Sequence, residues 1–292
     1  MPVEPNKPSL RSFFANHSRS WRDNLYVYPV ISRRAGGVSI GINLNPDKAC
    51  NFDCVYCQVD RTIPPTVRTV KLDVLREELE RTMAAVVGGE LFQGPQFASV
   101  PASNRRLNDI AFSGDGEPTA SPVFLEAVQV AADARRRFEL DELKLVVITD
   151  AAWLHRPRVR EALTILDANN GEIWAKLDAG TEERFRLINR PNCSLQRILD
   201  NILDAARIRP IVIQSLWMNV HGAPPPDAEV DAFAHRLREI LVAGGKIKLL
   251  QIYTIARRTT EPWVTPLDDP ALARIAERVR SIVDVPLAIY GT

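Results

Sequence analysis

The sequence has 292 residues, of which 46% are apolar and 25% charged, so it belongs with ordinary globular proteins and not with disordered or fibrous ones. The 37 Lys and Arg residues balance the 36 Asp and Glu residues, and the net charge of +1 gives no global attraction to nucleic-acid backbones or anionic membranes. No long apolar run or signal peptide is present, and three of the four cysteines are clustered rather than dispersed as in a disulfide framework. We therefore expect a cytoplasmic protein without a membrane span.

Apolar patterning divides the chain into alternating strands and helices. Runs of β-branched and apolar residues predict strands at 38–44, 107–112, 144–149, 172–177, 211–218, 248–255 and 286–290. Helical spacing of apolar residues predicts helices at 72–87, 122–138, 158–168, 181–188, 194–208, 224–245 and 270–283. These six βα units and the trailing strand predict an α/β fold with a parallel sheet, either doubly wound or curled into a full or partial barrel.

The whole chain, 1–292, is expected to form one domain, because no repeat, low-complexity tract or Pro/Gly-rich linker divides it. Residues 1–36 precede the first βα unit and are predicted to be an N-terminal extension. Residues 88–104 are rich in turn formers and lack periodicity, which predicts an insertion loop or a mobile lid. In either sheet architecture, catalytic groups gather at the carboxyl ends of the strands.

Three cysteines follow the first predicted strand in the run KACNFDCVYCQ, at Cys50, Cys54 and Cys57. Three thiolates on one short loop can ligate three corners of a cubane [4Fe–4S] cluster and leave the fourth iron open to a small molecule. The alternatives are a structural zinc site that recruits Cys193 or a histidine, and three unconnected buried cysteines. Zinc sites usually use paired C-x2-C knuckles, and no histidine lies near the loop in sequence, which favours the iron–sulfur interpretation.

The pattern C-x3-C-x-aromatic-C, with Tyr56 at the aromatic position, resembles the signature of the radical S-adenosylmethionine (SAM) superfamily. The resemblance implies a (β/α)6-type partial TIM barrel with a short trailing strand. It also implies two cofactors, a [4Fe–4S] cluster on Cys50, Cys54 and Cys57, and SAM bound to the fourth iron through its methionyl amine and carboxylate. In that family the reduced cluster cleaves a carbon–sulfur bond of SAM, and the resulting 5′-deoxyadenosyl radical abstracts hydrogen from a substrate.

A second segment, FSGDGEPT, follows the second predicted strand and resembles the family's Gly-Gly-Glu motif, which holds the methionine amino group. Gly114 and Gly116 allow a backbone to approach a ligand closely, and Glu117 can accept a charge-assisted hydrogen bond from an ammonium group. Asp115 separates the two glycines, so the match is in type and place rather than letter for letter. An ordinary Gly/Asp/Pro turn is the alternative.

The resemblance implies polar contacts to SAM at the ends of later strands, where Thr149, Asp150, Lys176 and Asp178 stand, and Asn189 and Arg190 follow one helix later. Lys176 and Asp178 share one face of a strand, so both can point into a barrel mouth, although a salt-bridged or solvated strand end has the same pattern. Polar residues also mark two later strands and indicate either a lined cavity or an exposed face: Gln214, Ser215, Gln251, Tyr253 and Arg257.

Over nearly its whole length the chain is similar to a branch of iron–sulfur oxidoreductases grouped with the wyosine-tRNA synthases, which act on a guanine of transfer RNA. The segments GINLNPDKACNFDCVYCQVDR, WAKLDAGTEERFRLINRP and LLQIYTIARRTTEP carry this resemblance. Those synthases have additional N-terminal cysteines for a second cluster, whereas this chain has none before Cys50. Because Cys193 alone cannot hold a second cluster, we expect one cluster per chain and do not expect the tRNA activity to transfer.

The sequence therefore predicts a radical SAM enzyme, of oxidoreductase or lyase type, that abstracts hydrogen from an unidentified substrate. The residues that act on the substrate are not predicted. The alternatives are wyosine-type modification of a tRNA guanine, and a non-enzymatic iron–sulfur or zinc protein. The resemblance also implies an electron donor such as flavodoxin or ferredoxin, and a substrate that is a small molecule, a peptide or tRNA.

Overall fold

The computed structural model describes residues 21–291, and these residues form one curved, mostly parallel sheet with helices outside it. All neighbouring strands of this sheet are parallel except the first pair, which is antiparallel. From one edge to the other the strands are β1 (Val27–Ser32), β2 (Gly37–Ile42), β3 (Leu107–Phe112), β4 (Lys144–Thr149), β5 (Gly171–Lys176), β6 (Ile211–Leu216), β8 (Ile247–Tyr253) and β10 (Leu287–Tyr290).

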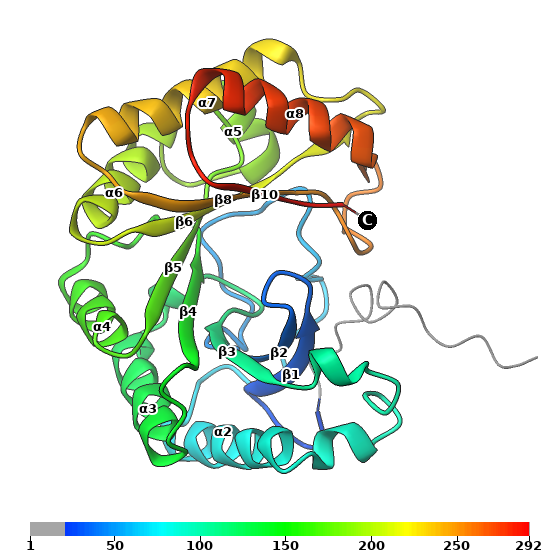
Figure 1. The fold of residues 1–292 in the computed structure, drawn as a ribbon, viewed down its shortest axis with the longest axis vertical. Coiled ribbons are helices and arrows are strands. Elements are labelled where there is room, and N and C mark those ends of the chain that lie inside the picture. Colours follow the sequence, from blue (N-terminus) through cyan, green and yellow to red (C-terminus); the bar gives the residue numbers. More distant parts are fainter. Residues whose placement is uncertain (1–20, 292) are drawn as a thin grey trace, which may run out of the picture.

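The helices follow the strands as the sequence predicts: α2 (Leu72–Val87), α3 (Phe124–Arg137), α4 (Pro157–Asp167), α5 (Glu182–Asn189), α6 (Leu195–Ile208), α7 (Asp227–Val242) and α8 (Asp269–Ile282). Most of them form an arc around the outer face of the sheet (Figure 1). Each turns an apolar stripe inward; in α2, Leu75, Leu79 and Met83 recur every four residues and are fully buried. The predicted partial TIM barrel with a trailing strand is confirmed.

The described part of the chain adds two strand pairings that the periodicity did not predict. β1 lies within the predicted N-terminal extension but pairs with β2 along its whole length. The buried Glu78 carboxylate of α2 holds the start of β1, because it accepts hydrogen bonds from the backbone N–H groups of Leu25, Tyr26 and Val27. The predicted strand 211–218 ends earlier, and β7 (Met218–Val220) pairs with β9 (Val264–Pro266) in a separate ribbon.

Residues 88–104, predicted to be an insertion loop or lid, form a connection with two short 3-10 helices, η1 (Glu90–Gln93) and η2 (Ala102–Asn104). This connection packs on the core through four buried apolar side chains, Leu91, Phe92, Phe97 and Val100. Residues 1–20 and 292, which include most of the predicted N-terminal extension, lie outside the described residues.

The inner face of the sheet is layered, because side chains two residues apart on a strand share a face. At the amino ends of the parallel strands, called the bottom here, Glu172 accepts hydrogen bonds from Lys144 (2.8 Å) and Lys248 (2.7 Å). Nearby on this face, Ser39 donates a hydrogen bond to Asp109. Above these residues lies an apolar layer that consists of Ala111, Val146, Trp174 and Val212.

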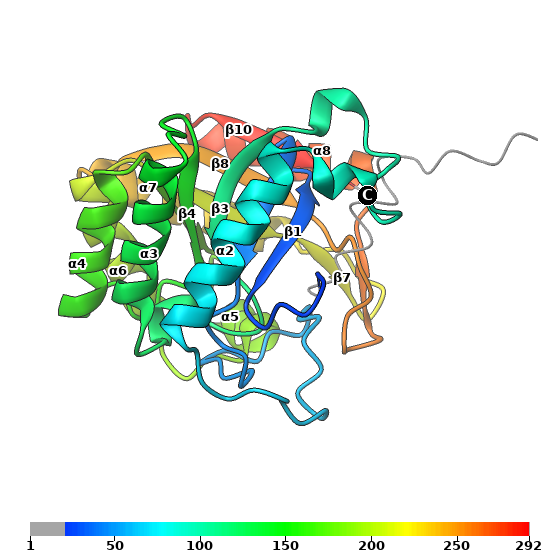
Figure 2. The same cartoon turned by 90° about the horizontal axis from the view of Figure 1, so that it is seen from below.

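The carboxyl ends of the strands, called the top here, carry polar side chains and the long loops. Lys176, Gln214 and Gln251 are neighbours in the strand register and form a polar inner layer there. In Figure 2 the blue segment between β2 and α2, which carries the three clustered cysteines, lies at the same end of the molecule as α5. The fold therefore places the cysteine loop at the end of the sheet where catalytic groups were expected.

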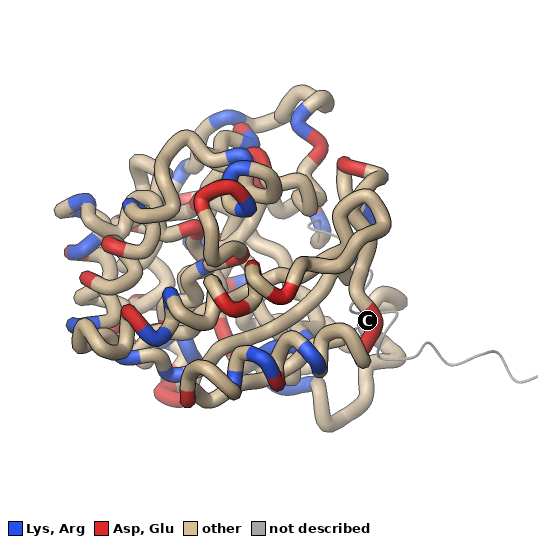
Figure 3. Tube along the Cα trace, turned by 90° about the horizontal axis from the view of Figure 1, so that it is seen from above, with Lys and Arg blue, Asp and Glu red and all other residues tan. Residues whose placement is uncertain are grey.

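Charge is mixed over the part of the chain that the structure describes. Figure 3 shows basic and acidic residues interspersed along the helices rather than gathered by sign. Among residues 21–291, no helix combines the length and the apolar composition needed to cross a membrane.

Candidate active site at the carboxyl ends of the strands

The cysteine loop is anchored to the last residues of α5. The backbone N–H of Asp53 donates to the carbonyl of Asn189 (3.2 Å), and that of Val55 donates to the carbonyl of Ile188 (2.9 Å). Within the loop, the N–H of Cys57 donates to the carbonyl of Cys54 (2.9 Å), which forms a turn over C-x2-C. This turn brings two of the three predicted cluster ligands onto one short arc.

The thiols have the surroundings of iron–sulfur ligands. Burial raises the pKa of Cys54 to about 12, and burial with the nearby charge of Asp150 does the same for Cys50. A thiol this hard to ionise becomes a thiolate when a cation binds it. N–H groups also point at sulfur: Asn189 Nδ2 lies 3.5 Å from Cys54 Sγ, while the Val59 backbone N and Arg61 Nη1 lie 3.4 and 3.5 Å from Cys57 Sγ.

This donor set fits a [4Fe–4S] cluster, since thiolates are its usual protein ligands and hydrogen bonds to sulfur are one way in which proteins tune it. Among the described residues, no three His, Cys, Asp or Glu side chains lie close enough together to hold a single metal ion. The remaining cysteine, Cys193, is partly exposed and lies two residues beyond Pro191, which forms an isolated β-bridge with Phe52 of the cysteine loop.

The FSGDGEPT turn packs directly on the start of the cysteine loop. A Cβ at Gly116 would lie 1.9 Å from the Ala49 carbonyl oxygen, and one at Gly114 would lie 2.3 Å from Asn43 Oδ1. The two glycines are therefore required by a close approach between two protein segments. Sequence reasoning expected the close approach to be with a ligand.

Glu117, predicted to receive an ammonium group, is buried and already accepts several hydrogen bonds. Its Oε1 accepts from the Thr119 backbone N (3.0 Å), the Thr119 hydroxyl and the Thr149 hydroxyl (2.7 Å), and its Oε2 accepts from the backbone N of Asp150 (2.8 Å). Thr149 thus touches Glu117, whereas sequence reasoning placed it in contact with SAM. Burial raises the pKa of Glu117, although these hydrogen bonds oppose the shift.

Asp150 forms a buried acidic pair with Glu117 and has an oxygen without a hydrogen bond. Burial, followed by the charge of Glu117, raises the pKa of Asp150 well above its usual value. Asp150 Oδ1 accepts from the backbone N of Ala152 (2.9 Å), but no donor meets buried Oδ2 with hydrogen-bond geometry. Asn51 lies close enough to favour the ionised carboxylate, yet its own amide atoms are buried without hydrogen bonds. Two carboxylates with an unmatched oxygen can accept a cation.

A second buried cluster centres on Asp178. Its Oδ1 accepts from the Leu216 backbone N (2.8 Å) and from Lys176 Nζ (3.3 Å). Its Oδ2 accepts from the Tyr56 hydroxyl and from Asn189 Nδ2 (3.1 Å). Asp178 therefore ties the aromatic residue of the cysteine motif to β6 and to the end of α5, and both its oxygens are occupied.

Lys176 is the cation of this cluster. Its ammonium donates to the Tyr253 hydroxyl (2.7 Å) as well as to Asp178, and it lies 4.9 and 5.2 Å from the ring centres of Tyr56 and Tyr253. Burial alone would lower the pKa of Lys176, but the charge of Asp178 and the phenol of Tyr253 outweigh burial and hold the pKa above its usual value. Lys176 is thus a protonated lysine at the barrel mouth.

The structure brings most of the predicted site residues to the top of the sheet in two groups, one around Glu117 and Thr149 and one around Tyr56, Lys176 and Asp178. Both groups touch the cysteine loop. Asn51 was not singled out from the sequence; an asparagine directly after the first cysteine gives no periodic or motif signal. Gln214 and Gln251 are buried on the inner face of the sheet, so they do not form an exposed face, which was one of the two interpretations of the sequence. Gln214 donates a hydrogen bond to Gln251 (2.8 Å).

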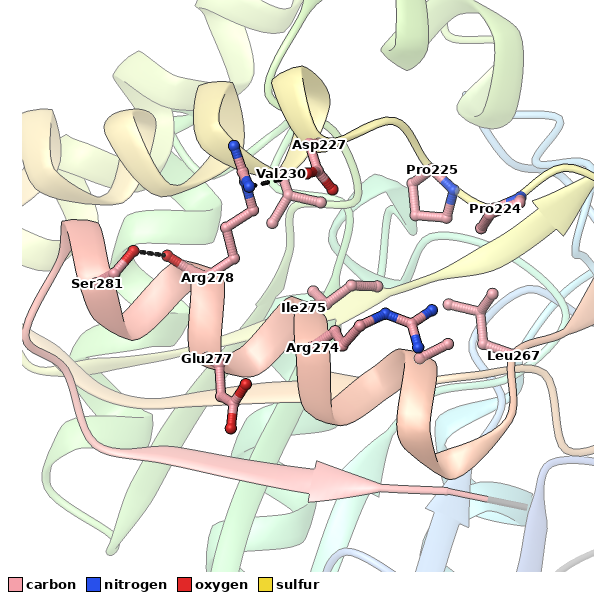
Figure 4. A pocket seen from close by; sticks show the side chains of 11 residues that line it. Pro224, Pro225, Asp227, Val230, Leu267, Arg274, Ile275, Glu277, Arg278 and Ser281 are labelled. Atoms are coloured by element: carbon pink, nitrogen blue, oxygen red, sulfur yellow. Dashed lines mark hydrogen bonds and ion pairs between the residues drawn. The ribbon is translucent and has the colours of Figure 1, made fainter.

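Another hollow of the molecule lies apart from this site. A groove of about 410 Å³ runs between α7 and α8 on the outer helical layer and is flanked by Pro224, Pro225 and the Arg278–Asp227 ion pair (Figure 4). It contains no cysteine and none of the predicted site residues. The cysteine end of the barrel is therefore the candidate active site.

The fold and the site together define an α/β partial barrel with three cysteines on the loop after the first parallel strand. A scan against protein-family models finds none that matches. UPF0026 protein MJ1312 of Methanocaldococcus jannaschii is 32% identical over 180 residues, which cover 60% of this chain and 46% of that protein. A protein of Brachyspira hyodysenteriae named GTPase Obg is 23% identical over 253 residues, or 84% of this chain and 32% of that protein. The chain thus matches a third to a half of these relatives' lengths.

Among solved structures, the chain shares the fold of TYW1 with a lysine-pyruvate adduct bound, at a TM-score of 0.50 and 13% identity, over 85% of this chain and 74% of that one. This likeness establishes the fold. The partial-barrel fold that the sequence motifs implied is thereby confirmed.

Proposed function

We propose that this protein is a radical SAM enzyme that binds a [4Fe–4S] cluster through Cys50, Cys54 and Cys57 and abstracts hydrogen from its substrate. The observation that carries the proposal is the position of the cysteine loop at the top of the barrel, with Cys50 near the buried Glu117–Asp150 pair and Cys54 beside Asn189 of the Asp178 cluster. The shared fold with TYW1 and the sequence motifs support it. When bound, the cluster would supply one electron, from a donor of the flavodoxin or ferredoxin type, for reductive cleavage of SAM to the 5′-deoxyadenosyl radical.

The acidic pair suits the amino group of SAM. Asp150 Oδ2 lacks a hydrogen-bond donor and Glu117 Oε2 has only one, so an ammonium between them would satisfy an oxygen whose burial is otherwise costly. Sequence reasoning assigned this role to Glu117 alone. In our proposal Asp150 supplies the open acceptor, and Glu117 holds the ends of β3 and β4 together and contributes charge.

The Tyr56–Asp178–Asn189 cluster suits the positioning of the cysteine loop. Asp178 fixes Tyr56, which precedes Cys57, and Asn189 donates to both Asp178 and Cys54 Sγ. Lys176 uses two of its three N–H groups inside the protein, and the third can donate to an oxygen of SAM or of the substrate. Asp178 is thus a positioning residue in this proposal, and Lys176 is the one that meets a ligand.

Modification of a tRNA guanine, as in the wyosine synthases, is the less favoured candidate. The TYW1 structure holds a lysine-pyruvate adduct. A lysine that forms an adduct with a carbonyl compound must lose its proton, whereas Asp178 and Tyr253 keep Lys176 protonated. The lysine of this barrel mouth is therefore set up to act as a cation rather than as a nucleophile.

Anaerobic reconstitution followed by SAM cleavage tests the proposal. Wild-type protein should bind about four irons and four sulfides per chain and, with dithionite, form 5′-deoxyadenosine that is detected by mass spectrometry. The Cys54→Ser variant should lose both properties, and Cys193→Ser, which alters a cysteine outside the loop, should retain them. Stoichiometric zinc without iron-linked absorbance, or a loaded cluster that never forms 5′-deoxyadenosine, would support the non-enzymatic alternative instead.

A further inference from the structure

A small pocket opens on the inner side of the sheet beside the cysteine loop. It has a volume of about 90 Å³ and lies between the turn that joins β1 to β2 and the segment that follows β8. Tyr56 and Gln58, the two neighbours of Cys57 in the sequence, form part of its wall. The pocket is lined by Ser32, Arg33, Arg34, Tyr56, Gln58, Leu216, Tyr253, Thr254, Ile255, Ala256 and Arg257.

This lining contains three arginines and no Asp or Glu. Arg33 and Arg34 form no ion pair with any residue from 21 to 291: Arg33 donates to the carbonyl of Gly291, and Arg34 stacks against the rings of Trp174 and Tyr253, at 5.6 and 5.2 Å from the ring centres. Arg257 donates to Gln58 (2.8 Å). Arg33 and Arg34 therefore bring two positive charges to a lining that holds no acidic side chain, and the charge of Arg34 also acts on Asp109 at the bottom of the sheet.

The electrostatics of Arg33 agree with this description. Burial lowers the pKa of Arg33, and the adjacent positive charge of Arg34 lowers it further. Two guanidinium groups that repel each other in a half-buried place are stabilised when an anion lies between them.

We propose that this pocket binds a phosphate monoester group of the substrate. The inference rests on the proposed function, since it names the class of substrate for the same barrel mouth. A phosphate monoester carries close to two negative charges and three terminal oxygens, which match several arginine forks better than one carboxylate does. A volume of about 90 Å³ is small enough to suit one terminal phosphate group rather than a length of nucleic-acid backbone.

Calorimetric titration of the reconstituted holoprotein with inorganic phosphate and with glycerol phosphate tests the proposal. Arg34→Gln should weaken the binding of both by about ten- to a hundredfold, because it removes a charge-assisted hydrogen-bonding fork. The Arg34→Lys variant keeps the positive charge but loses the guanidinium fork, so its affinity for phosphate should lie between those of wild type and Arg34→Gln. The matched control is Arg258→Gln, which alters an exposed arginine that does not line this pocket and should bind as wild type does.

Other arms of the same experiment identify the source of the anion. Saturating SAM should leave phosphate binding in place; competition between them would mean that the pocket holds the carboxylate of SAM, which overturns the proposal. An RNA oligonucleotide without a terminal phosphate should bind no better to wild type than to Arg34→Gln, and an arginine-dependent RNA affinity would overturn it too. Iron content and SAM binding are measured on wild type and on every variant. If wild-type protein holds its cluster and binds SAM but does not bind phosphate, the phosphate proposal is refuted and the proposed function is not.

Discussion

The two ends of the barrel handle buried polar groups in different ways. At the bottom, Glu172 accepts from Lys144, Lys248 and the indole N–H of Trp174, and Asp109 accepts from Ser39. None of these residues has a buried side-chain nitrogen or oxygen without a hydrogen bond. The buried polar atoms of these bottom residues all have hydrogen-bond partners within the protein, and most of these bonds link one strand to another.

The top is incomplete by the same measure. Asp150 Oδ2, both amide atoms of Asn51, Asn189 Oδ1 and Gln214 Oε1 are buried without hydrogen bonds, and all lie in or beside the cysteine loop and the inner face below it. Buried polar atoms are nearly always paired in folded proteins. The two ends therefore differ in how far the described chain pairs its own buried polar atoms, and the unpaired atoms of the top lie around the site proposed above.

The largest expected difference between the two ends is in the free energy of unfolding that is lost when one buried carboxylate is removed from each. Asp178→Ala leaves Lys176 as a buried, unpaired charge and frees the Leu216 N–H and the Tyr56 hydroxyl. We expect the free energy of unfolding to fall by about 3–5 kcal/mol. Glu172→Ala should cost about 1–2 kcal/mol, because Lys144 and Lys248 are 44% and 52% exposed and regain water. Chemical denaturation of the metal-free variants measures both; equal losses would contradict the contrast.

The bottom should also show a pH dependence that belongs to stability alone. Burial raises the pKa of Asp109 from 3.8 to about 6. Between these values the folded protein keeps a proton that the unfolded chain loses, so this group's contribution to stability is full below pH 4 and is lost as pH rises to about 6. At about 1.4 kcal/mol per pH unit the loss approaches 3 kcal/mol.

The Asp109→Asn variant tests this pH dependence, since it cannot ionise. Its free energy of unfolding relative to wild type should rise across the interval from pH 4 to about 6 and stay constant above it. Denaturant titrations at several pH values measure the difference. A parallel pH profile for the two proteins would show that Asp109 titrates normally.

At the top, Asp150→Asn should act on the ligand rather than on the fold. The variant replaces the open carboxylate oxygen, Oδ2, by an amide nitrogen that donates and cannot accept, but it keeps a similar shape, so we expect about ten- to a hundredfold weaker binding of SAM with unchanged iron content. Glu117→Gln should weaken SAM binding as well and also lower stability, because Glu117 accepts hydrogen bonds from Thr119, Thr149 and Asp150. Equilibrium titration of the reconstituted variants with SAM separates the two effects.

Much of the fold could be predicted from the sequence because local periodicity decides it. The six βα units appear within a few residues of their predicted bounds, since each strand and helix carries its own apolar pattern. β1 could not be predicted in this way. It is short, it contains Pro29, and part of what holds it is the carboxylate of Glu78, which lies 51 to 53 residues further along the chain.

The site was predictable where a motif carries it and not where distant residues meet. The cysteine spacing and the Gly-Asp-Gly-Glu turn are local patterns. The contact between Tyr56 and Asp178 joins residues 122 positions apart, and the pocket of Arg33, Arg34 and Arg257 joins a hairpin turn to the end of β8. No spacing rule connects such pairs, because tertiary packing alone brings them together.

The smallest expected effect is that of replacing Cys193, and it tests whether the cluster ligands at the top are limited to the cysteine loop. Cys193 is partly exposed and lies outside the cysteine loop, two residues beyond Pro191, which forms a β-bridge with Phe52 of that loop. One thiolate cannot hold a second cubane. Cys193→Ser should change the free energy of unfolding by about 0.5 kcal/mol or less and leave iron content at one cluster per chain. Iron analysis and denaturation check this, with Cys54→Ser as the variant that must lose iron. A loss of iron in Cys193→Ser comparable to that in Cys54→Ser would extend the ligand set beyond the loop and favour the recruited-cysteine metal site over the three-cysteine cluster.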